Sequence, residues 1–461
     1  MFTYTCLHYS LPNISYTFYF SAEAAAHRFA LPPAVPRVPV QQDLPPSPVH
    51  NVPSLQNLAM NFLALRLTDP RQPIFSISGL PEHLVQSFLA YLKKEKLLKP
   101  KMLHLIPSYL LKLDLDYYPY ATNELLHAAR IFHRVQILSL KACTLITDAG
   151  LNCIKSMKML KVLNLSGCSQ ITDHALEMLK DCENLQSLQL DGTKVSNAGL
   201  MELSKSSHQN HLVHLDLSRT GITHIFESFQ NFKRLKALAL KQTQICSLSG
   251  VEGLVNLESL DISDTQIVTD SILCLTRLPN LCNISLSGIQ AVHGDRALAY
   301  LKDLKLTSIL LPSRSTTSNI GMSYISGFQL TCLDLTNYIN VGDEGMLHVG
   351  QIVTLKKLLL SNTKVSDEGM QHLKCLCQLE VLFVDRTLIS SAGASVVSNF
   401  KNLNELSLSG TSVSDEFIQL GIVNRCLYLT KLNLSRTAIS NQGLCNNSCC
   451  LILFLFSLFL I

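Results

Sequence analysis

The chain has 461 residues, which is enough for two or three ordinary domains or for one long solenoid. Its net charge is only +4, from 38 basic and 34 acidic residues, and no run of lysine or arginine occurs, which argues against nucleic-acid binding. Hydrophobic residues make up 47% of the chain, as a long continuous core requires.

Proline is concentrated in residues 32–53. Because proline lacks a backbone N–H and interrupts helices, we predict an extended linker there and treat residues 1–53 as a disordered, proline-rich N-terminal region. The first twenty residues lack a basic segment followed by a clean apolar core, so a signal peptide is not expected.

Residues 54–105 are predicted to form a short helical segment. In its first helix, apolar residues recur at helical spacing, and Ser54 is a candidate N-cap: Leu55, Leu58, Ala59, Phe62 and Leu63. In its second helix Pro81 falls in the first turn, where its missing N–H costs nothing, and the apolar stripe has six members: Leu80, Leu84, Val85, Phe88, Leu89 and Leu92.

Residues 106–444 carry a ladder of apolar pairs of the form Leu-x-Leu. Subtracting neighbouring positions gives steps of 22 to 27 residues, and the first members of the pairs are Leu113, Leu138, Leu163, Leu188, Leu215, Leu238, Leu260, Ile284, Ile309, Leu333, Leu358, Leu382, Leu406 and Leu432. This period with Leu-x-x-Leu-x-Leu cores is typical of leucine-rich repeats. We therefore predict an α/β leucine-rich-repeat solenoid of about 14 repeats, with a strand, a turn and a return segment in each.

After most strands, Thr or Cys stands where many leucine-rich repeats have Asn, as in Cys168 and Thr193. Several return segments then begin with Ser or Thr before an acidic residue, as a helix N-cap would. Glycines follow, where neighbouring helices are expected to approach closely: Gly150, Gly199, Gly345, Gly369 and Gly443.

Two stretches depart from this pattern. The coils between Leu215 and Ile262 are short and lack the cap signal, so we expect 3₁₀ turns there. Ile289, Arg314 and Tyr338 replace the Thr or Cys residue, and the stretch 311–318 is irregular. A decayed repeat and a ligand-contacting loop are both consistent with this irregular middle.

Residues 445–461 form an uncharged apolar tail that replaces the expected helix. We interpret it as an artefact of gene assignment or splicing. A membrane anchor is the alternative, although the run is shorter than the roughly 20 residues that a spanning helix needs. The fifteen cysteines show neither a capping cluster nor zinc-ligand spacing, which favours a reducing compartment, the cytosol or the nucleus.

No catalytic motif, metal-ligand cluster or cofactor-binding loop occurs in the sequence, so we expect a non-enzymatic chain without metal or cofactor. Function is then expected at exposed positions beside the strands, where an unknown protein substrate would bind. The candidates are Lys141, Asp191, Arg219, Lys241, Asp385, Arg386 and Arg436.

The stretch Ser54–Leu63 resembles the elongin-binding box of cullin substrate receptors, in which Leu55, Ala59 and Leu63 would line the contact. The stretch that starts at Leu80 looks like a cullin-2 box, and the resemblance assigns it four contact residues: Leu80, Pro81, Leu84 and Phe88. With the repeats that follow, the chain resembles the zygote-defective (Zyg) family of leucine-rich receptors. The resemblance implies elongin B/C and cullin-2 as partners and a role as the substrate-recognition subunit of a ubiquitin ligase.

A second resemblance is to F-box proteins with leucine-rich repeats, because Leu80-Pro-Glu-His-Leu also looks like the start of an F-box. It implies a Skp adaptor and cullin-1 as the partners. A plain leucine-rich scaffold for protein binding is the third alternative, and none of the three involves a membrane.

Overall fold

The computed structural model describes residues 5–11, 14–20, 55–68, 77, 79–205, 211–225, 227–420, 426 and 428–440. The chain divides into two compact units, Met1–Pro53 and Ser54–Ile461. In the first unit, β1 (Thr5–Leu11) and β2 (Ile14–Phe20) pair antiparallel, although the sequence predicted no regular element there. The proline-rich stretch and the apolar tail lie outside the described residues, and their disorder and origin remain predictions.

Three helices precede the repeats in the second unit: α1 (Leu55–Thr68), α2 (Glu82–Lys94) and α3 (Pro100–Leu103). The first two are the helices that the apolar stripes predict. Helix α2 begins one residue after Pro81, whose carbonyl accepts hydrogen bonds from the N–H groups of Leu84 (3.0 Å) and Val85 (3.2 Å). Proline thus starts the helix without losing an internal bond.

Each repeat contributes one three-residue strand centred on the first residue of its apolar pair, so the described residues confirm the predicted 14 repeats and their register. The first nine strands form one parallel sheet. They are β3 (Lys112–Asp114), β4 (Ile137–Ser139), β5 (Val162–Asn164), β6 (Ser187–Gln189), β7 (His214–Asp216), β8 (Ala237–Ala239), β9 (Ser259–Asp261), β10 (Asn283–Ser285) and β11 (Ser308–Leu310).

The last five strands form a second parallel sheet: β12 (Cys332–Asp334), β13 (Lys357–Leu359), β14 (Val381–Phe383), β15 (Glu405–Ser407) and β16 (Lys431–Asn433). The break between β11 and β12 falls in the irregular middle. There the buried Tyr338 replaces the usual Thr or Cys, and its hydroxyl donates to the carbonyls of Leu311 (3.2 Å) and Pro312 (2.9 Å). A large ring therefore replaces a small side chain where the ladder stops.

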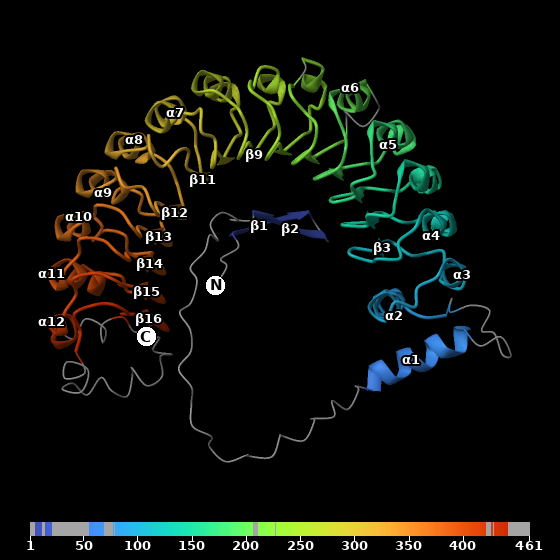
Figure 1. Cartoon of the computed structure of the whole chain (residues 1–461), viewed down its shortest axis with the longest axis horizontal. Coiled ribbons are helices and arrows are strands. Elements are labelled where there is room, and N and C mark those ends of the chain that lie inside the picture. The colour runs from blue at the N-terminus through green and yellow to red at the C-terminus, as the bar shows by residue number, and fades with distance from the viewer. Residues whose placement is uncertain are drawn as a thin grey trace, which may run out of the picture. The chain divides into compact units, whose positions relative to one another are not determined.

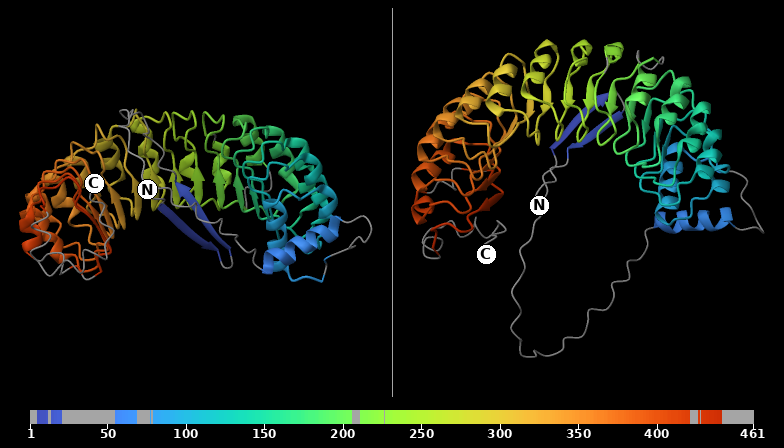
Figure 2. Two further views of the ribbon diagram at one scale, coloured as in Figure 1. Left: turned by 60° about the horizontal axis from the view of Figure 1, so that its bottom comes forward. Right: turned by 45° about the horizontal axis from the view of Figure 1, so that its top comes forward.

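Within the second unit, strands line the inner side of the curved array and the return segments lie on the outer side (Figures 1 and 2). The α-helical return segments are α4 (Asn123–Ala128), α5 (Asp173–Met178), α6 (Asn197–Lys205), α7 (Gly294–Leu301), α8 (Asn319–Ile325), α9 (Asp343–Val349), α10 (Asp367–His372), α11 (Ser391–Ala394) and α12 (Asp415–Gln419).

The 3₁₀ segments are η1 (Ala129–Ile131), η2 (Asp148–Ser156), η3 (Leu179–Asp181), η5 (Glu227–Asn231), η6 (Val251–Gly253), η7 (Thr269–Arg277) and η8 (Ser395–Asn399). Segments η5 and η6 confirm the 3₁₀ turns expected between Leu215 and Ile262. Segment η2 is also a 3₁₀ helix, although Thr147-Asp148 carries the same cap signal as the α-helical coils.

Both members of each apolar pair are buried in one continuous core, and the turn residues complete it. Cys143 and Cys168 donate their thiol hydrogens to the carbonyls of Leu115 and Leu140 in the preceding coil, at 3.1 Å each. Thr193 bonds within its own coil instead, to Leu190 at 2.7 Å. Thr and Cys therefore satisfy buried carbonyls by different routes.

Acidic residues at the helix starts link consecutive coils on the outer side. The Asp343 carboxylate accepts the N–H (2.7 Å) and the hydroxyl (2.6 Å) of Ser366 in the next coil. The same arrangement joins Asp367 to Ser390. A Cβ at Gly369 would lie 2.4 Å from the Asp343 Oδ1 atom, so this glycine makes room for the link. At this glycine the expected close approach is thus an approach to a carboxylate.

Candidate functional site

Helix α1 is apolar on two opposite sides. Ala64, 2% exposed, is buried in the core, and Met60 and Leu67 pack against that core. The opposite side carries large apolar side chains that face solvent: Leu58 (49% exposed), Phe62 (61%) and Leu65 (62%). A helix with one apolar side packed needs no second one for its own fold, so this outer stripe is a candidate binding surface.

The structure places the expected elongin-box residues unevenly. Ala59 is exposed, but Leu63 is half-buried and packs against the core. The side chain of Leu55 lies outside the described part of the chain. The helical spacing of apolar residues therefore predicted the helix correctly. Leu63, however, lies at the edge of the packed side, and the exposed stripe is made by Leu58, Phe62 and Leu65.

Helix α2 caps the first coil of the solenoid. Phe88 is fully buried, so it serves the core and is not exposed for the expected contact with a cullin. Leu80 is half-buried and packs against the same core. Pro81 is exposed and Leu84 is half-buried, so these two remain accessible at the start of α2. The apolar face of α2 is therefore explained by its role as a cap, because the open end of a solenoid must be covered.

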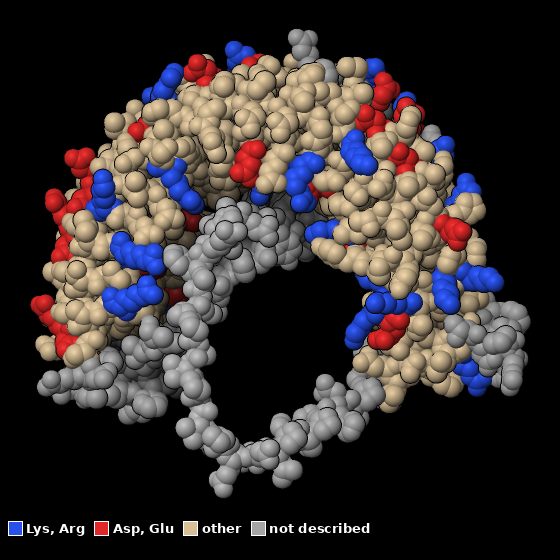
Figure 3. All heavy atoms as spheres, in the orientation of Figure 1, with Lys and Arg blue, Asp and Glu red and all other residues tan. Residues whose placement is uncertain are grey.

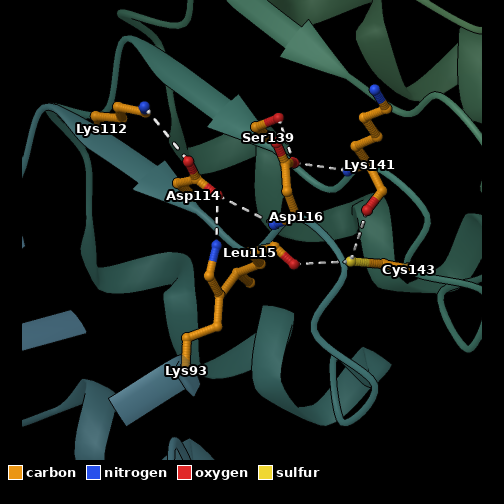
Figure 4. Close-up of polar contacts among 8 residues, drawn as sticks. All are labelled: Lys93, Lys112, Asp114, Leu115, Asp116, Ser139, Lys141 and Cys143. Carbon is orange, nitrogen blue, oxygen red and sulfur yellow. Dashed lines mark hydrogen bonds and ion pairs between the residues drawn. The ribbon is translucent and has the colours of Figure 1, made fainter. Parts of the chain in front are cut away.

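Polar contacts hold α2 to the first strand. The Gln86 amide donates to the carbonyl of Lys112 (2.7 Å), and the Lys93 ammonium lies 2.8 Å from the Asp114 Oδ1 atom. Figure 4 shows Lys93 and Lys112 reaching Asp114 from two elements, the latter at 3.4 Å from the Oδ2 atom. A cavity of about 320 Å³ lies beside these residues. The helical segment is therefore fixed to the repeats through α2.

The charge of Asp114 is stabilised at this junction. Burial alone would raise the pKa of Asp114, but the hydrogen bond and the charge of Lys93, followed by the N–H of Asp116 and the charge of Lys112, outweigh it and lower the pKa. Asp114 therefore stays ionised at neutral pH and keeps both lysines at the cap.

Asp385 was expected to contact a substrate, but the structure uses its carboxylate to join coils. The Oδ1 atom accepts the N–H of Ser409 (2.9 Å) and the hydroxyl of Ser407, and the Oδ2 atom accepts the hydroxyl of Ser361 (3.1 Å). Asp116 makes similar bonds to the next coil in Figure 4. Both carboxylates accept hydrogen bonds within the solenoid, and the role of Asp385 in substrate binding stays a prediction.

Lys141 and Lys241 are half-buried beside the strands. The Lys141 ammonium lies 5.5 Å from the centre of the Tyr117 ring, a cation–π distance. Burial raises the pKa of Asp261, and the charge of Lys241 opposes that rise. Each lysine therefore already interacts with a side chain of a neighbouring coil.

Three of the expected substrate contacts are arginines, and they differ in their surroundings. Arg219 forms a two-pronged pair with Asp191, with Nε–Oδ1 at 2.7 Å and Nη2–Oδ2 at 2.5 Å. Arg386 and Arg436 are exposed, and neither forms an ion pair within the described residues. Arg219 is therefore held in an ion pair, whereas the guanidinium groups of Arg386 and Arg436 are exposed to solvent.

Burial shifts the pKa of titratable groups in the core toward the neutral form. Burial lowers the pKa of His214 to about 4 and raises the pKa of Cys143 to about 12. Within the described ranges, no group of three or more His, Cys, Asp or Glu is arranged to hold a metal ion. None of the helices in that part of the chain is long and apolar enough to cross a bilayer.

Comparison with known proteins supports the fold. The family model described as "Leucine Rich repeat" matches residues 156–180 and 425–444. A leucine-rich-repeat protein from Leptospira interrogans is 19% identical, with a TM-score of 0.53 over 86% of this chain and 97% of that one. An internalin from Listeria monocytogenes is 21% identical, with a TM-score of 0.49 over 66% and 87% of the two chains. No curated protein sequence matches this chain.

Together with the 14 strands and their register, the family-model match and the Leptospira structure establish an α/β leucine-rich-repeat solenoid. At these identities the structural relatives define the fold alone.

Proposed function

We propose that this chain is a non-catalytic protein-binding subunit that holds a substrate for a cullin-RING ubiquitin ligase. The observation that carries the proposal is the exposed apolar stripe of α1, made by Leu58, Phe62 and Leu65. Burying a large apolar side chain contributes about 1.5–3 kcal/mol, so three of them could anchor a helix in a groove of another protein.

The adaptor is inferred from the resemblance of this helix to an elongin-binding box. Ala59 is small and exposed, which allows a partner to approach the helix axis closely. Pro81 and Leu84 remain accessible on the neighbouring α2 for a cullin contact. Elongin B/C and cullin-2 are therefore the proposed partners, with action in the cytosol or the nucleus.

The repeats would supply the substrate site. A solenoid presents a long surface of short strands, and the coils hold the exposed strand residues in fixed positions. Because Lys93 and Asp114 tie α2 to the first coil, a docked ligase and a bound substrate would keep a defined separation. The mechanism is proximity: this chain performs no chemistry and orients its partner toward the ubiquitin carrier.

The test is affinity purification of the full chain from cell lysate, with mass spectrometry of the co-purifying proteins. The variant Leu58→Ser/Phe62→Ser removes the centre of the stripe. The control variant Leu273→Ser/Ile320→Ser makes the same chemical change at exposed residues of the repeats (54% and 61% exposed). We expect elongin B/C and cullin-2 with the wild type and the control, and their loss with the α1 variant.

Other outcomes would redirect the proposal. A Skp adaptor with cullin-1 would assign the chain to F-box receptors. Loss of unrelated proteins from the α1 variant would leave a scaffold without a ligase. Equal co-purification with both variants would show that the α1 stripe does not bind an adaptor.

A further inference from the structure

Three arginines occupy one repeated turn position of the solenoid, in two kinds of surroundings. Arg219, Arg386 and Arg436 occupy equivalent places after β7, β14 and β16, all with left-handed backbone (φ of 53°, 52° and 59°). The chain therefore contains an internal comparison: the same residue, in the same turn conformation, with and without an acidic neighbour.

The acidic neighbour is present only at Arg219. Its partner Asp191 lies in the preceding coil, just after β6. The equivalent residue of the coil before Arg386 is Ser361, and that of the coil before Arg436 is Ser409. Substitution of serine for aspartate at these two positions leaves each guanidinium without the carboxylate that occupies Arg219.

Other nearby charges do not compensate. Asp385 is adjacent to Arg386 in sequence, but both of its oxygens are engaged by serines. At the opposite ends of the same strands, lysines are paired across coils, Lys431 with Glu405 at 2.5 Å and Lys356 with Glu380 at 3.1 Å. Acidic side chains lie along the outer edge of these coils (Figure 3), where α10 and α12 begin with Asp-Glu.

The surroundings of the two arginines suit an extended peptide. Gly410 lies between them in the coil order, and a Cβ there would approach the Arg386 Cγ atom to 3.2 Å, so the arginine stem passes close to this glycine. On the neighbouring strands Leu359 and Phe383 are register partners and half-buried, and they provide an apolar floor. Basic residues beside an apolar floor complement a peptide with both acidic and apolar side chains.

We propose that the turns after β14 and β16 bind an extended acidic segment of a protein partner, with one carboxylate on Arg386 and another on Arg436. Adjacent strands are about 4.8 Å apart, so two coils separate the arginines by about 10 Å. A peptide in the polyproline II conformation has three residues per turn and advances about 3.1 Å per residue, so carboxylates three residues apart lie on one side, about 9 Å apart. Leu359 and Phe383 lie on β13 and β14, so an apolar residue beyond the carboxylate bound to Arg386 would face them.

The proposal rests on the chain being a protein-binding solenoid, but it does not depend on what α1 binds. We would select a displayed library of random ten-residue peptides on the purified full chain. We expect enrichment of peptides with Asp or Glu at positions i and i+3 and an apolar residue that flanks this pair. Synthetic peptides of that pattern should bind about tenfold more weakly to Arg386→Gln or Arg436→Gln than to the wild type.

Two variants make the test specific. Arg219→Gln should leave binding unchanged, because Asp191 already occupies that arginine. Arg386→Gln/Arg436→Gln removes both guanidinium groups and should abolish selection of acidic pairs. Selection without paired acids, or acidic pairs that persist with Arg386→Gln/Arg436→Gln, would overturn the proposal. Neither result involves an adaptor protein, so a failure of this proposal can be distinguished from a failure of the proposal for α1.

Discussion

The carboxylate links between coils give a stability prediction that the structure makes quantitative. In Asp367→Ala, Ser390 loses the acceptor of its N–H (2.7 Å) and of its hydroxyl (2.5 Å). Hydrogen bonds to charged groups contribute roughly 1.5–3 kcal/mol each, but Asp367 is half-buried and water can replace part of the loss. We therefore expect a destabilisation of about 2–3 kcal/mol in total.

The assay is urea unfolding of the full chain, with hydrogen exchange of the Ser390 amide as a local readout, because a solenoid need not unfold in one step. Glu368→Ala is the matched control. Glu368 is the next residue on α10 and is exposed, so its loss should change the free energy of unfolding by less than about 0.5 kcal/mol. If Asp367→Ala and Glu368→Ala unfold alike, the carboxylate links do not stabilise the array.

Three further predictions concern the core. Leu163→Ala, at a fully buried strand centre, should destabilise by about 2–5 kcal/mol in urea unfolding, and Leu145→Ala, 54% exposed, by less than about 0.5 kcal/mol. Folding lowers the pKa of His214 to about 4, so the unfolded chain binds more protons between about pH 6.5 and 4. The free energy of unfolding should therefore decrease as the pH is lowered from about 6.5 to 4, and His214→Gln should make this decrease smaller. Iodoacetamide should label the exposed thiols and spare the buried ones of raised pKa: Cys246, Cys375 and Cys377 against Cys143, Cys153 and Cys168.

The strand register could be predicted in full because each strand is set by a local signal that recurs. Leu113, Leu138 and Leu163 sit at equal sequence intervals, and each becomes the centre of a strand paired with the next. A stacked array can bury its core in only one register, since a shift by one residue would turn the apolar pair toward solvent. The repeat pattern in the sequence therefore predicts the tertiary fold as well as the secondary structure.

The packed side of α1 could not be predicted in the same way. Both sides of the helix are apolar, so periodicity identifies the helix without saying which stripe meets the core. The choice depends on what the neighbouring α2 offers, and Ala64, the residue that packs most closely, lies outside the stripe read from the sequence. In α2 only one side of the helix is apolar, and this pattern predicts that Phe88 is buried. The resemblance to a docking helix instead assigned Phe88 to a contact with a partner.

Contacts between coils were missed for a different reason. Asp191 and Arg219 are 28 residues apart, and Asp367 and Ser390 are 23 apart, so neither pair stands out in a linear sequence. Superposing the repeats on one another would have brought each pair together. The same superposition distinguishes Arg219 from Arg386, because only the former has an aspartate in the preceding coil.

The solenoid also determines how far a change at one surface can reach. Each coil contacts only its neighbours, so a substitution at Arg386 acts on the adjoining coils and leaves the cap at the other end of the array in place. The sheet is moreover interrupted between β11 and β12, which separates the strands next to Arg386 and Arg436 from those next to the cap. The two proposed surfaces should therefore bind independently, and the free energies of binding measured for variants of α1 and of the arginine turns should add.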